Sequence, residues 1–258
     1  AIRSDSIAGY SPYIQVIVTI FMMLFGTNFA FYYLIIAKKV KDAFCMEEVK
    51  AYFAIFTAAT LLIAFNILSQ IGNVGDSLRH AAFQVASIMT TTGFATTDFD
   101  QWPEFSRTLL VMLMFIGACA GSTGGGIKVS RILMYMKTIK KELGILIHPR
   151  SVKIVMMDGK KLDHPVVRAA NIFLISYAGI LVASILLLTI DNFDFTTNVT
   201  AVISALNNIG PGLSLVGPAG NFAFFSGFSK YVLMFDMLAG RLEIFPMLLL
   251  FVPYTWKK

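Results

Sequence analysis

Two short glycine segments carry the most structural information in this chain: Thr91-Thr92-Gly93-Phe94-Ala95-Thr96 and Asn207-Asn208-Ile209-Gly210-Pro211-Gly212. Each follows a short apolar stretch of helical character, 81–90 and 198–206, and each precedes a long apolar span. Bare backbone at membrane depth is tolerated only where protein or a wet cavity surrounds it. Two such segments therefore predict re-entrant pore loops that form a selectivity filter, in which backbone carbonyls replace the hydration shell of a cation.

The composition indicates an integral membrane protein. Of the 258 residues, 57% are hydrophobic and 14% are charged, whereas soluble domains carry about 25% charged residues. The mean hydropathy is +0.72. A membrane span needs about 20 apolar residues, and four uncharged runs meet this length: 13–37, 51–75, 108–127 and 169–190. A fifth candidate, 231–256, is apolar but contains Asp236, Arg241 and Glu243.

The basic residues predict the orientation. If five spans alternate, 16 of the 21 lysines and arginines fall on one side, in the first loop (38–50), the segment 128–168 and the last two residues. Positive charge marks the cytoplasmic side, so the net charge of +6 reflects topology. The basic segment 128–168 is either a solvated face near anionic lipid or a docking surface for a cytosolic partner. Nucleic acid is not expected, because no aromatic or glycine binding motif accompanies the charge.

The order of the segments predicts an internal repeat. The unit is a membrane helix, a pore helix, a filter and a second membrane helix, and repeats of this kind are an architectural sign in membrane proteins. The first copy comprises 51–70, 77–90, 91–97 and 108–140, and the second comprises 167–190, 197–207, 208–213 and 229–256. Span 13–37 precedes both as the last helix of an earlier unit. The amino-terminus lacks a methionine and a signal peptide, which suggests a piece of a longer protein.

Four longer stretches carry a specific resemblance. They are TTTGFATTDFDQWPEFSR (90–107), GACAGSTGGGIKVSR (117–131), NNIGPGLSLVGPAGNF (207–222) and MLAGRLEIFP (237–246). With these, the chain resembles the carboxy-terminal half of the TrkH/KtrB/HKT superfamily of potassium transport proteins, with TrkH closest. The resemblance implies an all-α polytopic membrane protein, part of a single-chain pseudo-tetramer of helix–pore-helix–helix repeats. It divides the chain into the end of repeat two (1–46), repeat three (47–150) and repeat four (151–258).

The resemblance places the filter on Thr92, Gly93 and Phe94, and on Asn208, Ile209 and Gly210. Potassium would bind backbone carbonyls there, and the ion contacts are expected at Thr92, Gly93, Asn208 and Ile209. Glycine permits the left-handed backbone that turns successive carbonyls toward one axis. The alternative for each stretch is an ordinary glycine turn. Pro211, which lacks an N–H, makes the second segment unlike the first.

The segment 117–126, here called the glycine loop, has five glycines in ten residues. Each glycine costs a helix about 1 kcal/mol relative to alanine, so we expect span 108–140 to be broken over 118–126. Close helix packing through Gly117 and Gly121 is the alternative, but it does not explain three consecutive glycines. The resemblance implies a gate beneath the filter, made by Gly121, Gly124, Gly125, Gly126 and Arg241. A phosphate loop is excluded, because Lys128 does not follow the last glycine directly.

Arg241 is predicted at mid-depth in the final span, where a charge costs about 2.5–3.5 kcal/mol and arginine stays protonated. The alternative is snorkelling to an interface. The resemblance implies that Arg241 is an electrostatic barrier below the filter. Asp236 and Glu243 share no helix face with Arg241, so any ion pair of these acids would be with other helices.

Other chemistry is not indicated. His80, His148 and His164 are dispersed and are interpreted as loop or interface residues, Cys45 and Cys119 as free thiols, and no nucleophile–base pair suggests an enzyme.

Potassium uptake is thus the expected function, with potassium as substrate and no organic cofactor. The resemblance implies a location in the bacterial inner membrane, a homodimer of pore subunits in membrane lipid, and a cytosolic nucleotide-binding regulatory subunit similar to TrkA or KtrA. The alternative is a membrane-embedded enzyme or lipid-binding protein that uses the glycine loop and Arg241 to hold an anionic headgroup. A channel and a symporter, and potassium and sodium selectivity, are not distinguished by these residues.

Overall fold

The computed structural model describes residues 6–148, 154–241, 244, 247 and 249. Helix α1 (Pro12–Phe25) and helix α2 (Phe29–Ile36) meet at an 88° bend, so the expectation of a single helix over span 13–37 is wrong. Two residues explain the bend. The side chain of Asn28 caps α2 by accepting a hydrogen bond from the Ala30 amide at 2.8 Å. The carbonyl of Gly26 accepts the amide of Cys119 at 3.0 Å, so the chain turns against the glycine loop.

A short helix α3 (Val40–Cys45) leads into the long α4 (Glu47–Ile71), which ends at Gly72 in the left-handed conformation. Helix α5 (Val74–Met89) follows and is capped by the side chain of Asn73. The chain then returns through 90–103, including the 3-10 turn η1 (Phe99–Gln101), to α6 (Glu104–Met114). These elements match the expected span 51–70 and pore helix 77–90 closely.

The expected span 108–140 consists of two helices, α6 and α7 (Val129–Ile147), with 115–128 between them outside any helix. The expected break over 118–126 is therefore present. Beyond α7 lies a feature that the sequence analysis did not predict, an antiparallel hairpin of two short strands, β1 (Met156–Met157) and β2 (Lys160–Lys161).

Helix α8 (His164–Leu188) begins with proline in its first turn and continues into η2 (Thr189–Asp191). Helix α9 (Phe195–Leu206) is capped by the side chain of Asp194. The chain then passes through 207–226, with η3 (Ser214–Val216), to α10 (Gly227–Arg241). The expected span 229–256 thus begins as predicted, and most of it past Arg241 lies outside the described residues.

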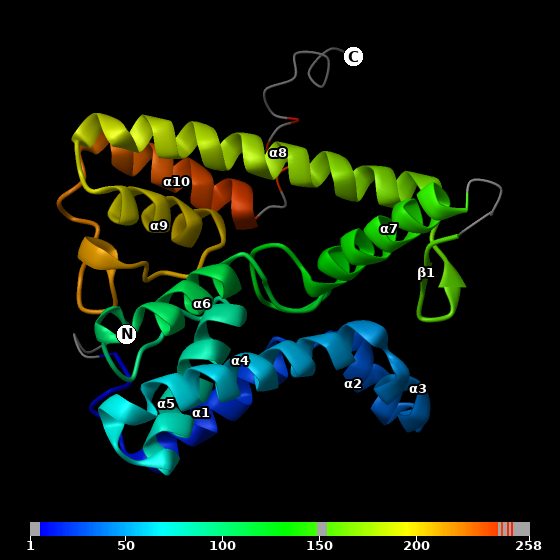
Figure 1. The fold of residues 1–258 in the computed structure, drawn as a ribbon, viewed down its shortest axis with the longest axis horizontal. Helices are drawn as coiled ribbons and strands as arrows, with labels where there is room; N and C mark the ends of the chain where they lie inside the picture. Colours follow the sequence, from blue (N-terminus) through cyan, green and yellow to red (C-terminus); the bar gives the residue numbers. More distant parts are fainter. Residues whose placement is uncertain (1–5, 149–153, 242–243, 245–246, 248, 250–258) are drawn as a thin grey trace.

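Two helical groups lie side by side (Figure 1). Helices α1, α4, α5 and α6 form one, with the bend to α2 and α3 at one end, and α8, α9 and α10 form the other. Helix α7 and the hairpin lie at the end where α2 and α3 lie (Figure 1). The two basic segments expected on the cytoplasmic side are therefore close together in space.

The short helices α5 and α9 form the buried centre, whereas the long helices expose apolar side chains. Phe83 and Met89 of α5 and Leu206 of α9 are fully buried. Phe65 of α4 and Ile175 of α8 are 82% and 72% exposed, as expected for a surface that faces lipid. Among the described residues α4 and α8 are long and apolar enough to cross a membrane, and the bent pair α1–α2 adds a third span if it counts as one.

Candidate functional site

The two pore loops have the same backbone plan. The carbonyl of Ser87 accepts the amide of Thr92 at 2.9 Å, and the carbonyl of Ser204 accepts the amide of Ile209 at 2.9 Å. The residues before these amides, Thr91 and Asn208, both have positive φ angles, 54° and 57°. Gly93 and Gly210 follow with φ of 77° and 115°, in the region that favours glycine.

This equivalence gives a register that differs from the expected one by one residue. Thr92 corresponds to Ile209 and Gly93 to Gly210, so Thr91 is the counterpart of Asn208. The expected triplets 92–94 and 208–210 are therefore out of step with each other. The motif comparison missed this because the two stretches share only the glycine, and the backbone hydrogen bonds that set the register are not visible in sequence.

The carbonyl of Phe94 already has a partner. It accepts a hydrogen bond from the Ser87 hydroxyl at 2.6 Å, which ties it back to the pore helix α5. The corresponding serine of the second loop, Ser204, accepts the amide of Gly210 at 3.1 Å with its side chain. Of the six residues expected in the filter, Phe94 is thus the one whose carbonyl is engaged by a side chain of its own pore helix.

The two segments expected to form the filter, 91–97 and 208–213 and here called the filter segments, lie in direct contact. A β-carbon added to Gly93 would come 2.1 Å from the carbonyl oxygen of Ile209. Farther along the return segments, the carboxylate oxygen Oδ1 of Asp100 accepts the amide of Ser214 and a guanidinium N–H of Arg107, each at 3.1 Å. Segments that belong to separate repeats in the sequence, 91–107 and 208–214, are therefore in direct contact with each other.

The glycine loop is closed at its base by strand-like contacts. The amide of Gly117 donates to the carbonyl of Ile127 at 2.8 Å, and the amide of Val129 donates to the carbonyl of Ala118 at 3.2 Å. Gly121 and Gly126 have φ of 66° and 69°, and such turns are strained for any other residue. The two ends of the loop, which connect to α6 and α7, therefore lie next to each other.

The tip of the glycine loop lies against both filter segments. The amide of Gly125 donates to the hydroxyl of Thr91 at 2.8 Å. On the other side, a β-carbon on Gly125 would come 2.6 Å from the carbonyl of Asn207. The Asn207 side chain is itself held by the hydroxyl of Tyr177, at 2.8 and 3.1 Å. Gly125 is thus required because the loop backbone packs against the backbone of Asn207. A β-carbon on Gly124 would come 2.7 Å from that of Ala118 within the loop, and Gly126 is favoured by its positive φ.

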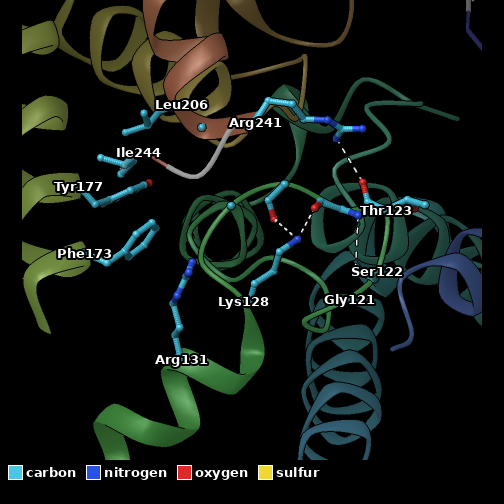
Figure 2. Close-up of a pocket in the computed structure, with 14 residues that line it drawn as sticks. Gly121, Ser122, Thr123, Lys128, Arg131, Phe173, Tyr177, Leu206, Arg241 and Ile244 are labelled. Atoms are coloured by element: carbon cyan, nitrogen blue, oxygen red, sulfur yellow. Dashed lines mark hydrogen bonds between the residues drawn. The ribbon is translucent and has the colours of Figure 1, made fainter. Parts of the chain in front are cut away.

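A cavity of about 360 Å³ lies beside the loop and contains three basic side chains (Figure 2). Lys128 donates its ammonium group to the carbonyls of Gly124 and Gly125. The guanidinium of Arg131 lies 4.0 Å from the ring centre of Phe173. The other lining residues are Gly121, Ser122, Thr123, Gly126, Tyr177, Leu206, Gly240, Arg241 and Ile244.

Arg241 is the last residue of α10, and its guanidinium Nη1 donates to the carbonyl of Thr123 in the glycine loop at 3.2 Å. The expected proximity of Arg241 to the loop is present. Asp236 lies elsewhere: it is fully buried and accepts the hydroxyl of Ser184 at 2.7 Å. Glu243 is outside the described residues. Gly240 allows the end of α10, which carries Arg241, to approach the end of α9 closely, because a β-carbon at Gly240 would come 1.7 Å from the carbonyl of Leu206.

Sequence reasoning missed two residues of this site. In sequence, Lys128 counts among the basic residues of 128–168 and against a phosphate loop, and its spacing four residues after Gly124 could have indicated a contact within the loop. Glu48, on α4, is 3% exposed and binds the glycine loop from 72 residues away in sequence, a contact for which the sequence has no signal.

Of the histidines expected in loops or interfaces, His80 lies within α5, and its Nδ1 is 2.9 Å from the hydroxyl of Thr96. Cys45 and Cys119 are free thiols, as expected.

Two loops with one backbone plan beside a broken helix, in a chain with helices long and apolar enough to cross a membrane, are typical of integral membrane transport proteins with pore loops. The family model described as "TrkH: Cation transport protein" matches residues 66–258. The chain therefore belongs to the TrkH family of cation transport proteins, which is a family of transporters and not of enzymes.

Individual relatives agree with this family. The chain is 36% identical over 261 residues to the Trk system potassium uptake protein TrkH of Salmonella typhimurium, which covers 98% of this chain and 53% of that protein. It is 30% identical to the Trk system potassium uptake protein TrkG of Escherichia coli, with 99% of this chain and 53% of that protein covered.

Among solved structures, the potassium transporter TrkH from Vibrio parahaemolyticus superposes with a TM-score of 0.90 at 36% identity, covering 98% of this chain and 55% of that one. The chain thus spans about half the length of the relatives it matches.

Proposed function

We propose that this chain forms half of the ion pathway of a potassium uptake system, in which dehydrated potassium ions bind backbone carbonyls of the two filter segments. The observation that carries this proposal is the shared plan of the pore loops, with Gly93 and Gly210 at equivalent positions and positive φ. The names of the relatives, which are potassium uptake proteins and a potassium transporter, support potassium as the transported ion.

In this proposal the ion sites follow the structural register. Thr91, Thr92 and Gly93 are matched with Asn208, Ile209 and Gly210, so the carbonyls of Thr92 and Ile209 stand at one level. Phe94 has a structural role, because its carbonyl is bound to Ser87. Two further segments, from outside this chain, complete the ring. No organic cofactor is needed for ion dehydration by carbonyls.

The gate is the glycine loop with Arg241. Its tip bonds to Thr91 directly beside the filter, and Lys128 and Arg241 both donate to its carbonyls. Positive charge in the path below a filter raises the barrier for a cation, by up to about 4 kcal/mol at 4 Å for an effective dielectric constant of 20. This arrangement supports a closed state in which the loop backbone and the two side chains obstruct the path.

Membership of the family supports a proposal for the setting of the pore. We propose that the protein lies in the bacterial inner membrane, as a homodimer of pore subunits surrounded by lipid, with the repeats divided at 1–46, 47–150 and 151–258. A cytosolic nucleotide-binding regulatory subunit would dock at the end that holds α3, α7 and the hairpin. The name "Trk system" of the relatives supports a multi-component assembly.

The test is rubidium influx into proteoliposomes that contain the natural protein. We expect uptake that potassium competes for and that sodium competes for more weakly. Absence of rubidium uptake by protein with a native unfolding transition would refute the proposed function. An empty-liposome control and a Gly93→Ser variant separate filter-dependent uptake from leakage.

A further inference from the structure

Glu48 is a buried carboxylate at the base of the glycine loop. It is the second residue of α4 and is 3% exposed. Its Oε1 accepts the amide of Ala120 at 2.6 Å and the amide of Ser130 at 3.0 Å. Its Oε2 accepts the side-chain amide of Asn28 at 3.3 Å. A buried carboxylate is costly unless it is hydrogen-bonded, and three donors converge on this one.

The two backbone donors come from opposite arms of the loop. Ala120 lies on the arm that leaves α6, whereas Ser130 is the second residue of α7 on the arm that returns. Lys128, at the position before α7, gives no side-chain cap to that helix, so Glu48 serves as a cap supplied by another helix. A negative charge at a helix amino-terminus is also favoured by the helix dipole. One carboxylate therefore ties both ends of the loop to α4.

The third donor connects the clamp to the bend of the preceding helix pair. Asn28 holds Glu48 with its amide nitrogen while its amide oxygen caps α2. Beside it, the amide of Phe29 donates to the carbonyl of Gly121 at 3.2 Å. The bend between α1 and α2 thus places the start of α2 against the loop, and Glu48 joins three segments that are distant in sequence: 26–30, 118–121 and 128–130.

We propose that Glu48 is a positioning residue for the gate: its charge holds the glycine loop in the place where the loop obstructs the pathway. The loop tip is held by the bond from Gly125 to Thr91 and by Lys128 and Arg241, which donate to its carbonyls. At the base, the single carboxylate of Glu48 supplies charge-assisted bonds, which are the stronger kind, to both arms. Loss of the carboxylate frees both arms at once. The inference rests on the proposed pore function and adds the residue that keeps the gate closed.

Glu47 provides a matched control in the same helical turn. Its carboxylate pairs with Lys137, and its amide donates to the carboxylate of Asp158 at 2.7 Å in the hairpin region. Glu47→Gln therefore removes a neighbouring negative charge and a contact to α7 without touching the base of the loop. Comparison of the two positions separates the clamp from a general effect of charge at the start of α4.

The experiment compares Glu48→Ala, Glu48→Gln and Glu47→Gln in the natural protein by two measurements. The first is hydrogen exchange at the Ala120 and Ser130 amides, which we expect to accelerate in both Glu48 variants and to stay unchanged in Glu47→Gln. The second is rubidium influx, which we expect to rise at least about tenfold in Glu48→Ala. Tenfold is about the change that the loss of one charge-assisted hydrogen bond makes to an equilibrium, and Glu48 accepts three such bonds. Selectivity for potassium over sodium should not change.

The outcomes are distinct. Unchanged exchange at Ala120 and Ser130 in both Glu48 variants would overturn the inference, whatever the flux. Accelerated exchange with unchanged flux would leave Glu48 as the loop's anchor but overturn its role in gating. If no variant and no unmodified protein passes rubidium, the proposed pore function fails, while the exchange data still test the clamp. If Glu48→Ala does not fold, Glu48→Gln is read in the same way, because it keeps the side-chain shape.

Discussion

The backbone of Gly93 lies directly against the carbonyl oxygen of Ile209, so close that a β-carbon on Gly93 would come within 2.1 Å of it. Gly93 also has a φ of 77°, which other residues rarely adopt. The two filter segments therefore constrain each other. A side chain at Gly93 must displace the opposing segment, and the disturbance falls on Ile209, the counterpart of Thr92.

From this contact we expect Gly93→Ser to lower rubidium influx by about ten- to a hundredfold, because overpacking by one group costs about 1–3 kcal/mol. Gly210→Ser should act similarly through its φ of 115°. Gly179→Ser, on α8, is the matched control, since nothing lies within 4 Å of a β-carbon there. Unchanged influx in both filter variants would sink the filter assignment.

Removal of the positive charge at Arg241 should increase influx. Arg241 donates to the carbonyl of Thr123, so its loss removes both a barrier charge and a contact that holds the loop. We expect Arg241→Ala to raise rubidium influx about tenfold, well below the unscreened Coulomb limit, with selectivity unchanged. Arg241→Lys keeps the positive charge, so rubidium influx should rise less in this variant. A large fall in influx at normal insertion would mean that Arg241 supports the fold or a partner contact.

The link between the return segments should contribute to stability. Asp100 bonds to Arg107 and to the Ser214 amide, and both charged side chains are partly exposed, which weakens the pair. We expect Asp100→Asn to lower the apparent Tm in detergent by about 2–4 °C, the shift for about 1 kcal/mol in a chain of this size. Glu104→Gln removes the other, exposed partner of Arg107 and should change the Tm little. Equal shifts for both variants would contradict a specific role for Asp100.

Acid should weaken the cap of α9. Hydrogen bonds from Thr197 lower the pKa of the Asp194 carboxyl below its ordinary value. The stabilisation is therefore complete above the unfolded pKa of about 3.9 and is lost as the pH falls through the lower folded value. The Tm difference between the natural protein and Asp194→Asn, measured between about pH 6 and pH 3, should shrink toward low pH.

The control for this titration is Asp163→Asn. Asp163 precedes α8, and within the described chain its side chain makes no capping hydrogen bond. A Tm difference for Asp194→Asn that is constant with pH, or one that Asp163→Asn reproduces, would argue against the cap as its source.

Local chemistry made much of this structure predictable. The lengths of α4, α5, α8 and α9 follow from apolar runs and caps, and the break before α7 follows from the low helix propensity of glycine. The bend at Gly26–Asn28 was not predicted, because the run 13–37 is uninterrupted by charge. The Asn28 cap is local, but the contact of Gly26 with Cys119 is distant in sequence.

The site was less predictable than the fold. The glycines that form it stand out in sequence, but the register between Thr92 and Ile209 depends on backbone hydrogen bonds to Ser87 and Ser204. In sequence, Glu48 cannot be distinguished from any other glutamate at the start of a helix, and its role is visible only from the tertiary contact with Ala120. Motifs thus identify the segments, whereas long-range hydrogen bonds decide which atoms act together.

The hydrogen bond between the Thr91 hydroxyl and the Gly125 amide has a thermodynamic consequence. If opening the glycine loop breaks this bond, the loop and the filter share a coupling free energy, and coupling is reciprocal. Ions that order the filter must then also favour the closed loop, and an open loop must bind ions less tightly. Fast ion throughput and tight ion binding would therefore be opposed to each other by this hydrogen bond. A Thr91→Val variant, which lacks the hydroxyl, should weaken the coupling between loop opening and ion binding.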